Sequence, residues 1–183
     1  MSAAARLNGL HCQYNKVLRA DMVLQHMPKN PQEIAKPKKM ILRYHPRGEG
    51  MPKLLPGITM LDLIAQHKPT LMNLGYRGAK RQVTIGGRSD LRGPAMYQCL
   101  SDILLQVLPQ IERSPPSINR AAGTFTFSVG AGLGFDQILP HYTHFDGLAP
   151  VYVDVEVKPP EGMSTVMQGL GLPAPQPGAK RRR

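Results

Sequence analysis

The sequence predicts an α+β fold in which helices accompany an antiparallel sheet. Two segments, 124–129 and 151–157, alternate polar and apolar residues, which is typical of strands with one buried and one solvated face. In the second segment, Asp154 and Glu156 occupy the polar side. A sheet with one solvated face is more often antiparallel than parallel, because parallel sheets are covered on both faces. Two longer segments have the 3.6-residue apolar spacing of amphipathic helices: 7–27 and 94–108.

The first helix is expected to end before Pro28, because a residue that precedes proline avoids the helical conformation. Its apolar stripe consists of Leu7, Leu10, Tyr14, Val17, Leu18, Met22 and Leu24. The helix at 94–108 has a proline in its first turn, where proline is favourable. Its buried stripe is expected to consist of Met96, Leu100, Ile103, Leu104 and Val107. Shorter helices are predicted at 58–67 and 161–170.

The remaining segments are shorter strands and connecting loops. Residues 28–39, here called the strap, are rich in Pro and Lys and precede a candidate strand at 40–44. Residues 45–57 are rich in Gly and Pro and are expected to form a loop. Runs at 70–74 and 82–85 predict a hairpin, and its basic tip is 75–81. The chain thus divides into an N-terminal extension (1–6), one domain (7–172) and a disordered basic tail (173–183).

The charge of the chain predicts a polyanionic partner. Its 23 Lys and Arg exceed its 12 Asp and Glu, for a formal net charge of +11. Residues 1–100 hold 16 of the cations and only 5 of the acids, so the basic surface is expected on the first half. Nucleic acid and an anionic membrane surface both fit, since cations that dock on phosphates release counterions. No apolar run approaches the roughly 20 residues that span a bilayer, so no membrane partner is expected.

No enzyme, cofactor or metal site is predicted. The glycines of Gly130–Gly134 follow a strand and partly resemble a dinucleotide-binding turn, but Pro140 interrupts any following helix and that site needs further βαβ units. A bulge or an irregular turn is the simpler interpretation. His141 and His144 have no second pair of ligands nearby, whereas zinc takes three or four.

Two basic clusters are the candidate sites. Lys36, Lys38, Lys39 and Arg43 group at the strap and the first strand. Tyr76, Arg77, Lys80 and Arg81 group at the tip, with Arg88 and Arg92 shortly after. Cations beside a planar tyrosine suit structured RNA, where phosphate contacts and stacking act together. A generic solvated basic surface is the alternative interpretation of either cluster.

Several motifs, in order, resemble those of the ribosomal protein L five family. Residues 10–21 and Asn30–Pro37 are similar to its opening helix and strap. His67–Pro69, the tip, Leu91–Gly93, Met96–Tyr97 and Val107–Ile111 are similar to its next stretch. Gly123–Gly130, Asp136–Pro140 and the segment 151–157 are similar to its final motifs. The resemblance covers about residues 7–172.

This resemblance implies an antiparallel sheet with helices packed on one side, located in the central protuberance of the large ribosomal subunit. It implies binding to 5S or equivalent rRNA and to large-subunit rRNA, beside other central-protuberance proteins. It also implies that the tip reaches the elbow of the P-site tRNA, and that the protein meets a small-subunit head protein of the S thirteen family.

By position, the resemblance places Asn30, Glu33, Lys36, Lys38 and Lys39 in the RNA-facing strap. Arg43, Arg88 and Arg92 are added to this RNA-binding set for their charge. The tRNA-contacting tip comprises Tyr76, Arg77, Gly78, Lys80 and Arg81, and further RNA contacts are expected from Lys180, Arg181, Arg182 and Arg183.

The chain also departs from the family pattern. The tip is a few residues shorter than in bacterial members, Ala149-Pro150 replaces an Arg-Gly before the last long strand, and the basic tail is additional. These departures favour a mitochondrial ribosome over a plastid or bacterial one. The alternatives to a ribosomal constituent are a free RNA-binding regulator or assembly factor, and an oxidoreductase that uses the glycine turn.

Overall fold

The fold is built on one six-stranded sheet. The computed structural model describes residues 9–46, 51–75, 82–107, 109, 117–119, 122–130 and 134–172. Within them the strand order is β2-β3-β1-β6-β5-β4, and every neighbouring pair is antiparallel. The predicted α+β class with an antiparallel sheet is therefore confirmed. The strands are β1 (Lys36–Tyr44), β2 (Thr70–Gly75), β3 (Gln82–Leu91), β4 (Ser117–Asn119), β5 (Thr124–Val129) and β6 (Val151–Lys158).

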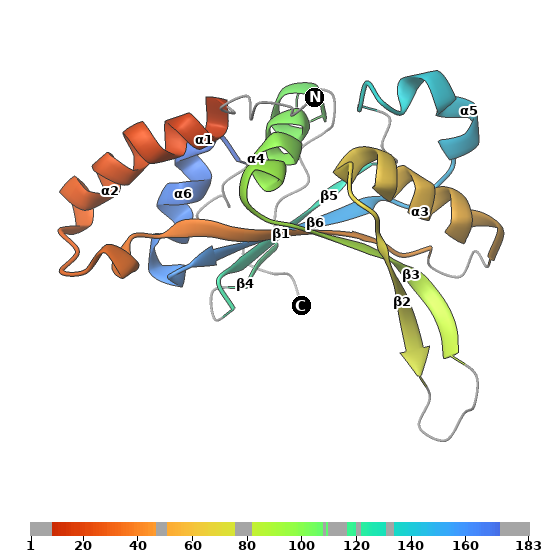
Figure 1. Cartoon of the computed structure of the whole chain (residues 1–183), viewed down its shortest axis with the longest axis horizontal. Helices are drawn as coiled ribbons and strands as arrows, with labels where there is room; N and C mark the ends of the chain where they lie inside the picture. The colour runs from red at the N-terminus through yellow and green to blue at the C-terminus, as the bar shows by residue number, and fades with distance from the viewer. Residues whose placement is uncertain are drawn as a thin grey trace, which may run out of the picture.

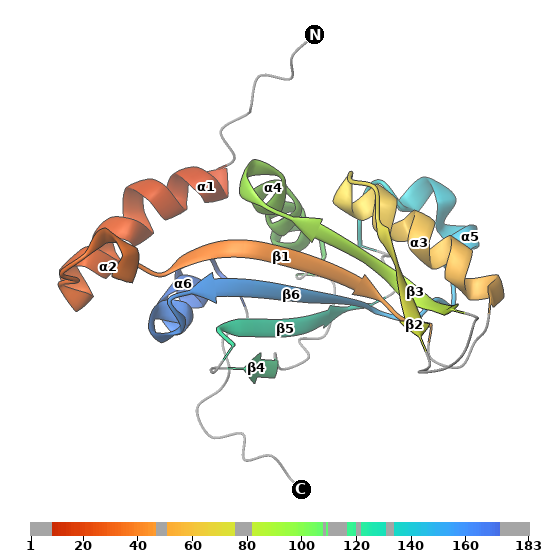
Figure 2. The ribbon, with the colours of Figure 1, turned by 60° about the horizontal axis from the view of Figure 1, so that its bottom comes forward.

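The α-helices pack on one face of this sheet, as Figure 1 shows. The order of the strands is clearest in Figure 2, where β1 and β6 run side by side through the middle. The helical elements are α1 (Gly9–Gln13), η1 (Tyr14–Leu18), α2 (Arg19–His26), η2 (Pro31–Glu33), α3 (Met51–Ala65), α4 (Gly93–Asp102), η3 (Ile103–Val107), η4 (Leu139–His141), α5 (Tyr142–Phe145), η5 (Pro160–Gly162) and α6 (Met163–Gly169).

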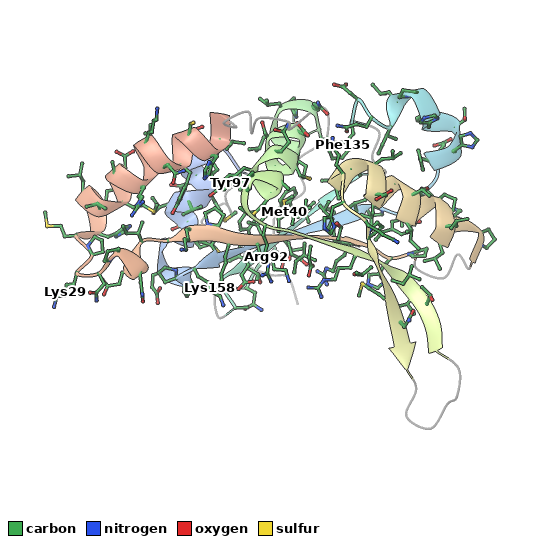
Figure 3. The ribbon with its side chains drawn as sticks, in the orientation of Figure 1. Lys29, Met40, Arg92, Tyr97, Phe135 and Lys158 are labelled. Carbon is green, nitrogen blue, oxygen red and sulfur yellow. The ribbon has the colours of Figure 1, made fainter. Side chains whose placement is uncertain are left out.

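The core lies between the helices and the sheet, because alternate side chains of each strand point to the helix side. Met40, Leu42 and Tyr44 of β1 are fully buried there. In β6 and β5 the valines and phenylalanines of the alternating segments are buried in the same layer. Figure 3 shows Met40 on the helix side of the sheet and Lys158 on the opposite side. The apolar residues of the alternating segments therefore face the helices, and the polar residues face the opposite side of the sheet, as predicted.

The first predicted helix is confirmed as a continuous run from Gly9 to His26, with a π-helical turn at η1. Its buried residues, Tyr14, Leu18 and Met22, recur every four positions. The expectation that Val17 and Leu24 are also buried is wrong, since their side chains are 51% and 73% exposed. Only one side of the helix touches the core, so the apolar stripe is narrower than its composition predicts.

The loop expected at 45–57 is wrong in its second half, because α3 already begins at Met51. Pro52 lies in the first turn of α3, where proline is accepted because the N–H that it lacks would have no partner in the helix. Pro56 lies inside α3 and removes one backbone hydrogen bond. Burial of Leu54, Met60, Leu61 and Ile64 against the sheet outweighs that loss.

β1 begins at Lys36, so the second part of the strap is a strand and not a loop. The expected hairpin is confirmed, since β2 and β3 pair from Thr70–Arg88 to Gly75–Gln82. Its connection at 76–81 and the tail at 173–183 lie outside the described residues. Within the part of the chain that the structure describes, no helix combines the length and apolar character needed to cross a bilayer.

The glycine turn after β5 leads to an antiparallel neighbour. β5 and β6 pair from Thr124–Glu156 to Val129–Val151, whereas a dinucleotide site lies between parallel strands of βαβ units. Residues 131–133 of this turn lie outside the described part. The pairing of β5 with β6 therefore speaks against the nucleotide-binding interpretation of Gly130–Gly134.

Candidate nucleic-acid interface

No described helix covers the second face of the sheet, which is here called the open face. Its side chains alternate with those of the core and align in rows across the strands. One row runs Arg88, Arg43, Tyr152, Ser128 across β3, β1, β6 and β5. The next row runs Asp90, Ile41, Asp154, Thr126 across the same strands. The open face is therefore polar, and it carries cations, acids and one aromatic ring side by side.

A buried carboxylate holds Arg43 in place. Its Nε lies 2.6 Å from Oδ2 of Asp154, and its Nη2 donates a hydrogen bond of 2.9 Å to Oδ1. The hydroxyl of Thr126 also donates to Oδ1, at 2.6 Å. Asp154 is only 9% exposed, so it is well shielded from water. Because the guanidinium of Arg43 contacts both oxygens of this carboxylate, the orientation of its plane is fixed. Its other N–H groups remain able to donate to another acceptor.

Asp90 gathers two more cations on the same face. Arg88 donates from Nε and Nη2 to the two Asp90 oxygens at 2.7 and 3.1 Å, and Lys39 Nζ lies 2.9 Å from Oδ2. Partial burial alone would raise the pKa of the Asp90 carboxyl. The hydrogen bonds and positive charges of Arg88 and Lys39 outweigh burial and lower this pKa. The carboxylate therefore stays ionised at neutral pH and holds both cations beside each other.

Positive charge remains in excess on the open face. Lys36 lies directly opposite Lys158, and like charges placed opposite each other repel. Lys158 is paired with Glu156 at 3.0 Å, but Lys38 protrudes nearby at an irregularity in β1 and is exposed. Repulsion between neighbouring lysines is relieved by a bound anion, so this end of the face suits a phosphate.

The strap is held by hydrogen bonds among its own residues and by one from the first helix. Glu33 accepts hydrogen bonds from the backbone N–H of Lys29 at 2.9 Å and from the Asn30 side chain at 3.2 Å. The Tyr14 hydroxyl donates to the carbonyl of Ala35 at 2.9 Å and ties the strap to the first helix. Asn30 and Glu33 thus fix the turn at η2, and a carboxylate in that place is not itself a partner for phosphate.

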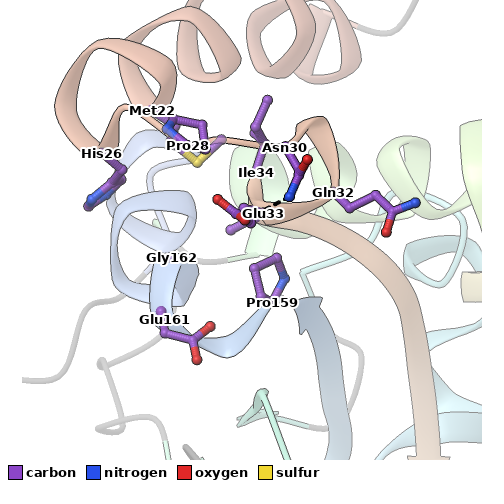
Figure 4. Close-up of a pocket in the computed structure, with 11 residues that line it drawn as sticks. Met22, His26, Pro28, Asn30, Gln32, Glu33, Ile34, Pro159, Glu161 and Gly162 are labelled. Carbon is purple, nitrogen blue, oxygen red and sulfur yellow. Dashed lines mark hydrogen bonds between the residues drawn. The ribbon is translucent and has the colours of Figure 1, made fainter.

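A cavity of about 520 Å³ lies beside the strap, between the end of α2 and η5. Figure 4 shows Asn30, Glu33 and Ile34 on the strap side and Pro159, Glu161 and Gly162 on the other. Its lining is largely apolar, with Glu33 and Glu161 as its acids and His26 at its rim. An anionic ligand is therefore not favoured there.

The structure brings together some of the predicted RNA-binding residues and separates others. Lys36, Lys39, Arg43 and Arg88 share the open face. Asn30 and Glu33 lie at the strap turn, and Arg92 is exposed just before α4. The remaining predicted contacts lie outside the described residues: Tyr76, Arg77, Gly78, Lys80, Arg81, Lys180, Arg181, Arg182 and Arg183.

Sequence reasoning missed the residues that organise the open face. Tyr152 and Asp154 occupy the polar side of a segment recognised as a strand, and Thr126 occupies the polar side of the other. The alternation alone therefore located them on a solvated face. It did not reveal that Asp154 pairs with Arg43, because 111 residues separate the two in sequence.

Replacing Asp154 with alanine should lower the free energy of unfolding by about 2 kcal/mol, because a half-buried Arg43 loses its partner. Glu156→Ala is the matched control on the same strand. Its partner Lys158 is 54% exposed, so its loss should cost less than about 1 kcal/mol. Urea unfolding of both variants checks this, and equal losses would contradict a special role for Asp154.

Comparison with known proteins gives one near full-length similarity. The chain is 25% identical over 179 residues to the Large ribosomal subunit protein uL5m of Reclinomonas americana. The alignment covers 91% of this chain and 98% of that protein. No family model matches the chain. The similarity to uL5m agrees with the resemblance of the sequence motifs to the ribosomal protein L five family, and the antiparallel sheet with helices on one face is the fold that this resemblance implies.

Proposed function

We propose that the chain is a structural constituent of the large subunit of a mitochondrial ribosome. The observation that carries this proposal is the similarity to uL5m, which extends over nearly all of both chains. The basic composition supports it, since a net charge of +11 favours a polyanionic neighbour. The protein's place is then the mitochondrial matrix, within the ribosome.

The open face and the strap are the proposed contact with 5S or equivalent rRNA and with large-subunit rRNA. Lys39, Arg43 and Arg88 are held by carboxylates, so their orientation is set before RNA binds. Preorganised cations lose less conformational entropy on binding than flexible ones. Lys36 and Lys38 add exposed charges at one end of the same region, where phosphate contacts set affinity.

The tip is the proposed contact with the other parts of the ribosome. β2 and β3 project from the body as a hairpin (Figure 1), which suits a segment that reaches a distant partner. Its basic residues 76–81 are proposed to meet the P-site tRNA and a small-subunit head protein of the S thirteen family. The remaining surface is proposed to lie against other proteins of the central protuberance.

Sedimentation of mitochondrial ribosomes tests the proposal. A tagged chain should occur in large subunits in equal number with other subunit proteins, and should stay with them when monosomes are dissociated by magnesium removal. Occurrence only in the free fractions would contradict the proposal. Substoichiometric occupancy that exchanges with a free pool would instead indicate an assembly factor or a regulator.

The same gradients test the tip. A variant with Arg77, Lys80 and Arg81 replaced by alanine should still enter large subunits, because the open face is intact, yet those ribosomes should retain less P-site tRNA. Failure of this variant to enter subunits would assign the tip to assembly rather than to tRNA contact.

A further inference from the structure

A second cavity, of about 460 Å³, opens on the open face where β1 ends between β3 and β6. It is lined by Arg43, His45, Pro46, Ile85 and Tyr152. Arg43 and Tyr152 lie directly opposite each other on neighbouring strands, so their side chains emerge on the same side. Its volume falls within the range of small-ligand sites.

Planar side-chain groups line this cavity, and their neighbours hold them in place. Asp154 fixes the plane of the Arg43 guanidinium through two contacts. Tyr152 is only partly exposed, so its ring is confined by its neighbours. His45 Nδ1 lies 3.2 Å from the carbonyl oxygen of Ile85. A carbonyl only accepts, so Nδ1 is the donor in this contact, which holds the ring against β3.

The surroundings decide which ligand fits. Among the residues that the structure describes, none of those lining the cavity is an acid, and Arg88 lies directly opposite Arg43 on its other side. A cationic side chain of a partner is therefore disfavoured. Flat rings stack on tyrosine and on guanidinium planes, and a ring attached to a phosphate gains from the two arginines as well. Pro46 and Ile85 supply apolar contact but no charge.

We propose that this cavity receives a single unstacked base of folded RNA, with Tyr152 as its stacking surface and Arg43 as a donor at its edge. The inference rests on the proposed function, because the RNA must lie on the open face. It adds a local specificity that phosphate contacts lack: RNA with an extruded base is preferred to a continuous helix.

Two blunt-ended RNA duplexes of equal length test the inference, one fully paired and one with a single bulged 2-aminopurine. The full chain should bind the bulged duplex about 10-fold more tightly, as one stacked base allows. Binding should also change the fluorescence of the bulged base. Tyr152→Ala should reduce the affinity for the bulged duplex to that for the paired one, and should leave the paired affinity unchanged.

Two variants serve as controls. Tyr152→Phe keeps the ring and should keep the preference, because stacking does not need the hydroxyl. Tyr142→Ala removes an exposed tyrosine of α5, on the helix side of the sheet (Figure 1), and should change nothing. Urea unfolding shows whether Tyr152→Ala is folded, and Tyr152→Leu replaces it if it is not.

The outcomes separate this inference from the proposed function. The inference is overturned, while RNA binding stands, if the wild-type chain binds both duplexes equally. It is overturned likewise if Tyr152→Ala still prefers the bulged duplex, or if it binds both duplexes more weakly by the same factor. If the wild-type chain binds neither duplex at low salt, the proposed function fails as well. In intact ribosomes, crosslinking of residues 151–158 to a protein instead of RNA would also overturn it.

Discussion

Replacing Gly57 with alanine is expected to lower the free energy of unfolding by about 3 kcal/mol, the upper end of overpacking costs. A β-carbon at this buried position of α3 would overlap the ring of Tyr44. That ring is fully buried, and its hydroxyl donates to the carbonyl of Lys53 in α3 at 3.1 Å. The ring is thus held on both sides, and the helix must move away from the sheet instead.

Gly9→Ala is the matched control, because a β-carbon at Gly9 meets no atom of the described residues within 4 Å. Alanine there should leave stability unchanged or raise it slightly, since alanine favours helix. Urea unfolding measures both variants. The double variant Gly57→Ala, Tyr44→Leu should lose less than the sum of the single losses. Full additivity would mean that Gly57 is needed for a reason other than contact with Tyr44.

Replacing Lys36 and Lys38 together is expected to have the largest effect on RNA binding. Each is exposed at the end of the open face. If each contacts one phosphate of helical RNA, the slope of log affinity against log salt should fall in magnitude by about 1.8 units. That corresponds to about a 10-fold smaller loss of affinity between 50 and 200 mM salt. Titrations of the full chain with one RNA duplex at several salt concentrations measure this slope.

Lys39→Ala provides an internal comparison. Its ammonium is paired with Asp90 at 2.9 Å and its side chain is 15% exposed, so it should change the slope less than Lys36 or Lys38. Lys16 and Arg19 offer a matched removal of two cations from the first helix, on the helix side of the sheet. If their loss lowers the slope as much as the loss of Lys36 and Lys38, the contact is not confined to the open face.

Local periodicity was enough to predict the elements that have one buried side. β5 spans the residues predicted from alternation, and β6 extends that prediction by one residue. The helix predicted at 94–108 is confirmed as α4 and η3, and four of the five residues of its stripe are buried. These predictions succeed because an element with one solvated side has polar residues at regular intervals in its sequence.

Amino-acid composition gave wrong predictions for segments whose secondary structure is determined by tertiary packing. The prolines and glycines at 45–57 favoured a loop, yet the apolar residues of α3 pack on the sheet and extend the helix to Met51. The lysines of the strap also favoured a loop, yet Lys36 and Lys39 form part of β1, because β6 supplies their backbone partners. A single sequence does not reveal such partners when they are more than a hundred residues away.

The candidate site was predicted by residue type more than by geometry. The concentration of cations in the first half pointed to Lys36, Lys39, Arg43 and Arg88, which share the open face. The acids of the second half, Asp154 and Glu156, were expected only to be solvated. Asp154 instead orients Arg43, so the two halves with unequal charge meet on one surface.

The position of β1 has a consequence for synthesis of the chain. This strand is made first, but its two neighbours are β3 and β6, and β6 ends at Lys158. Until a ribosome has translated the chain as far as β6, one edge of β1 therefore has no backbone partner. Unpaired edges of apolar strands attract other strands, so nascent or truncated chains should need a chaperone, and the sheet closes only after residues 151–158 have emerged.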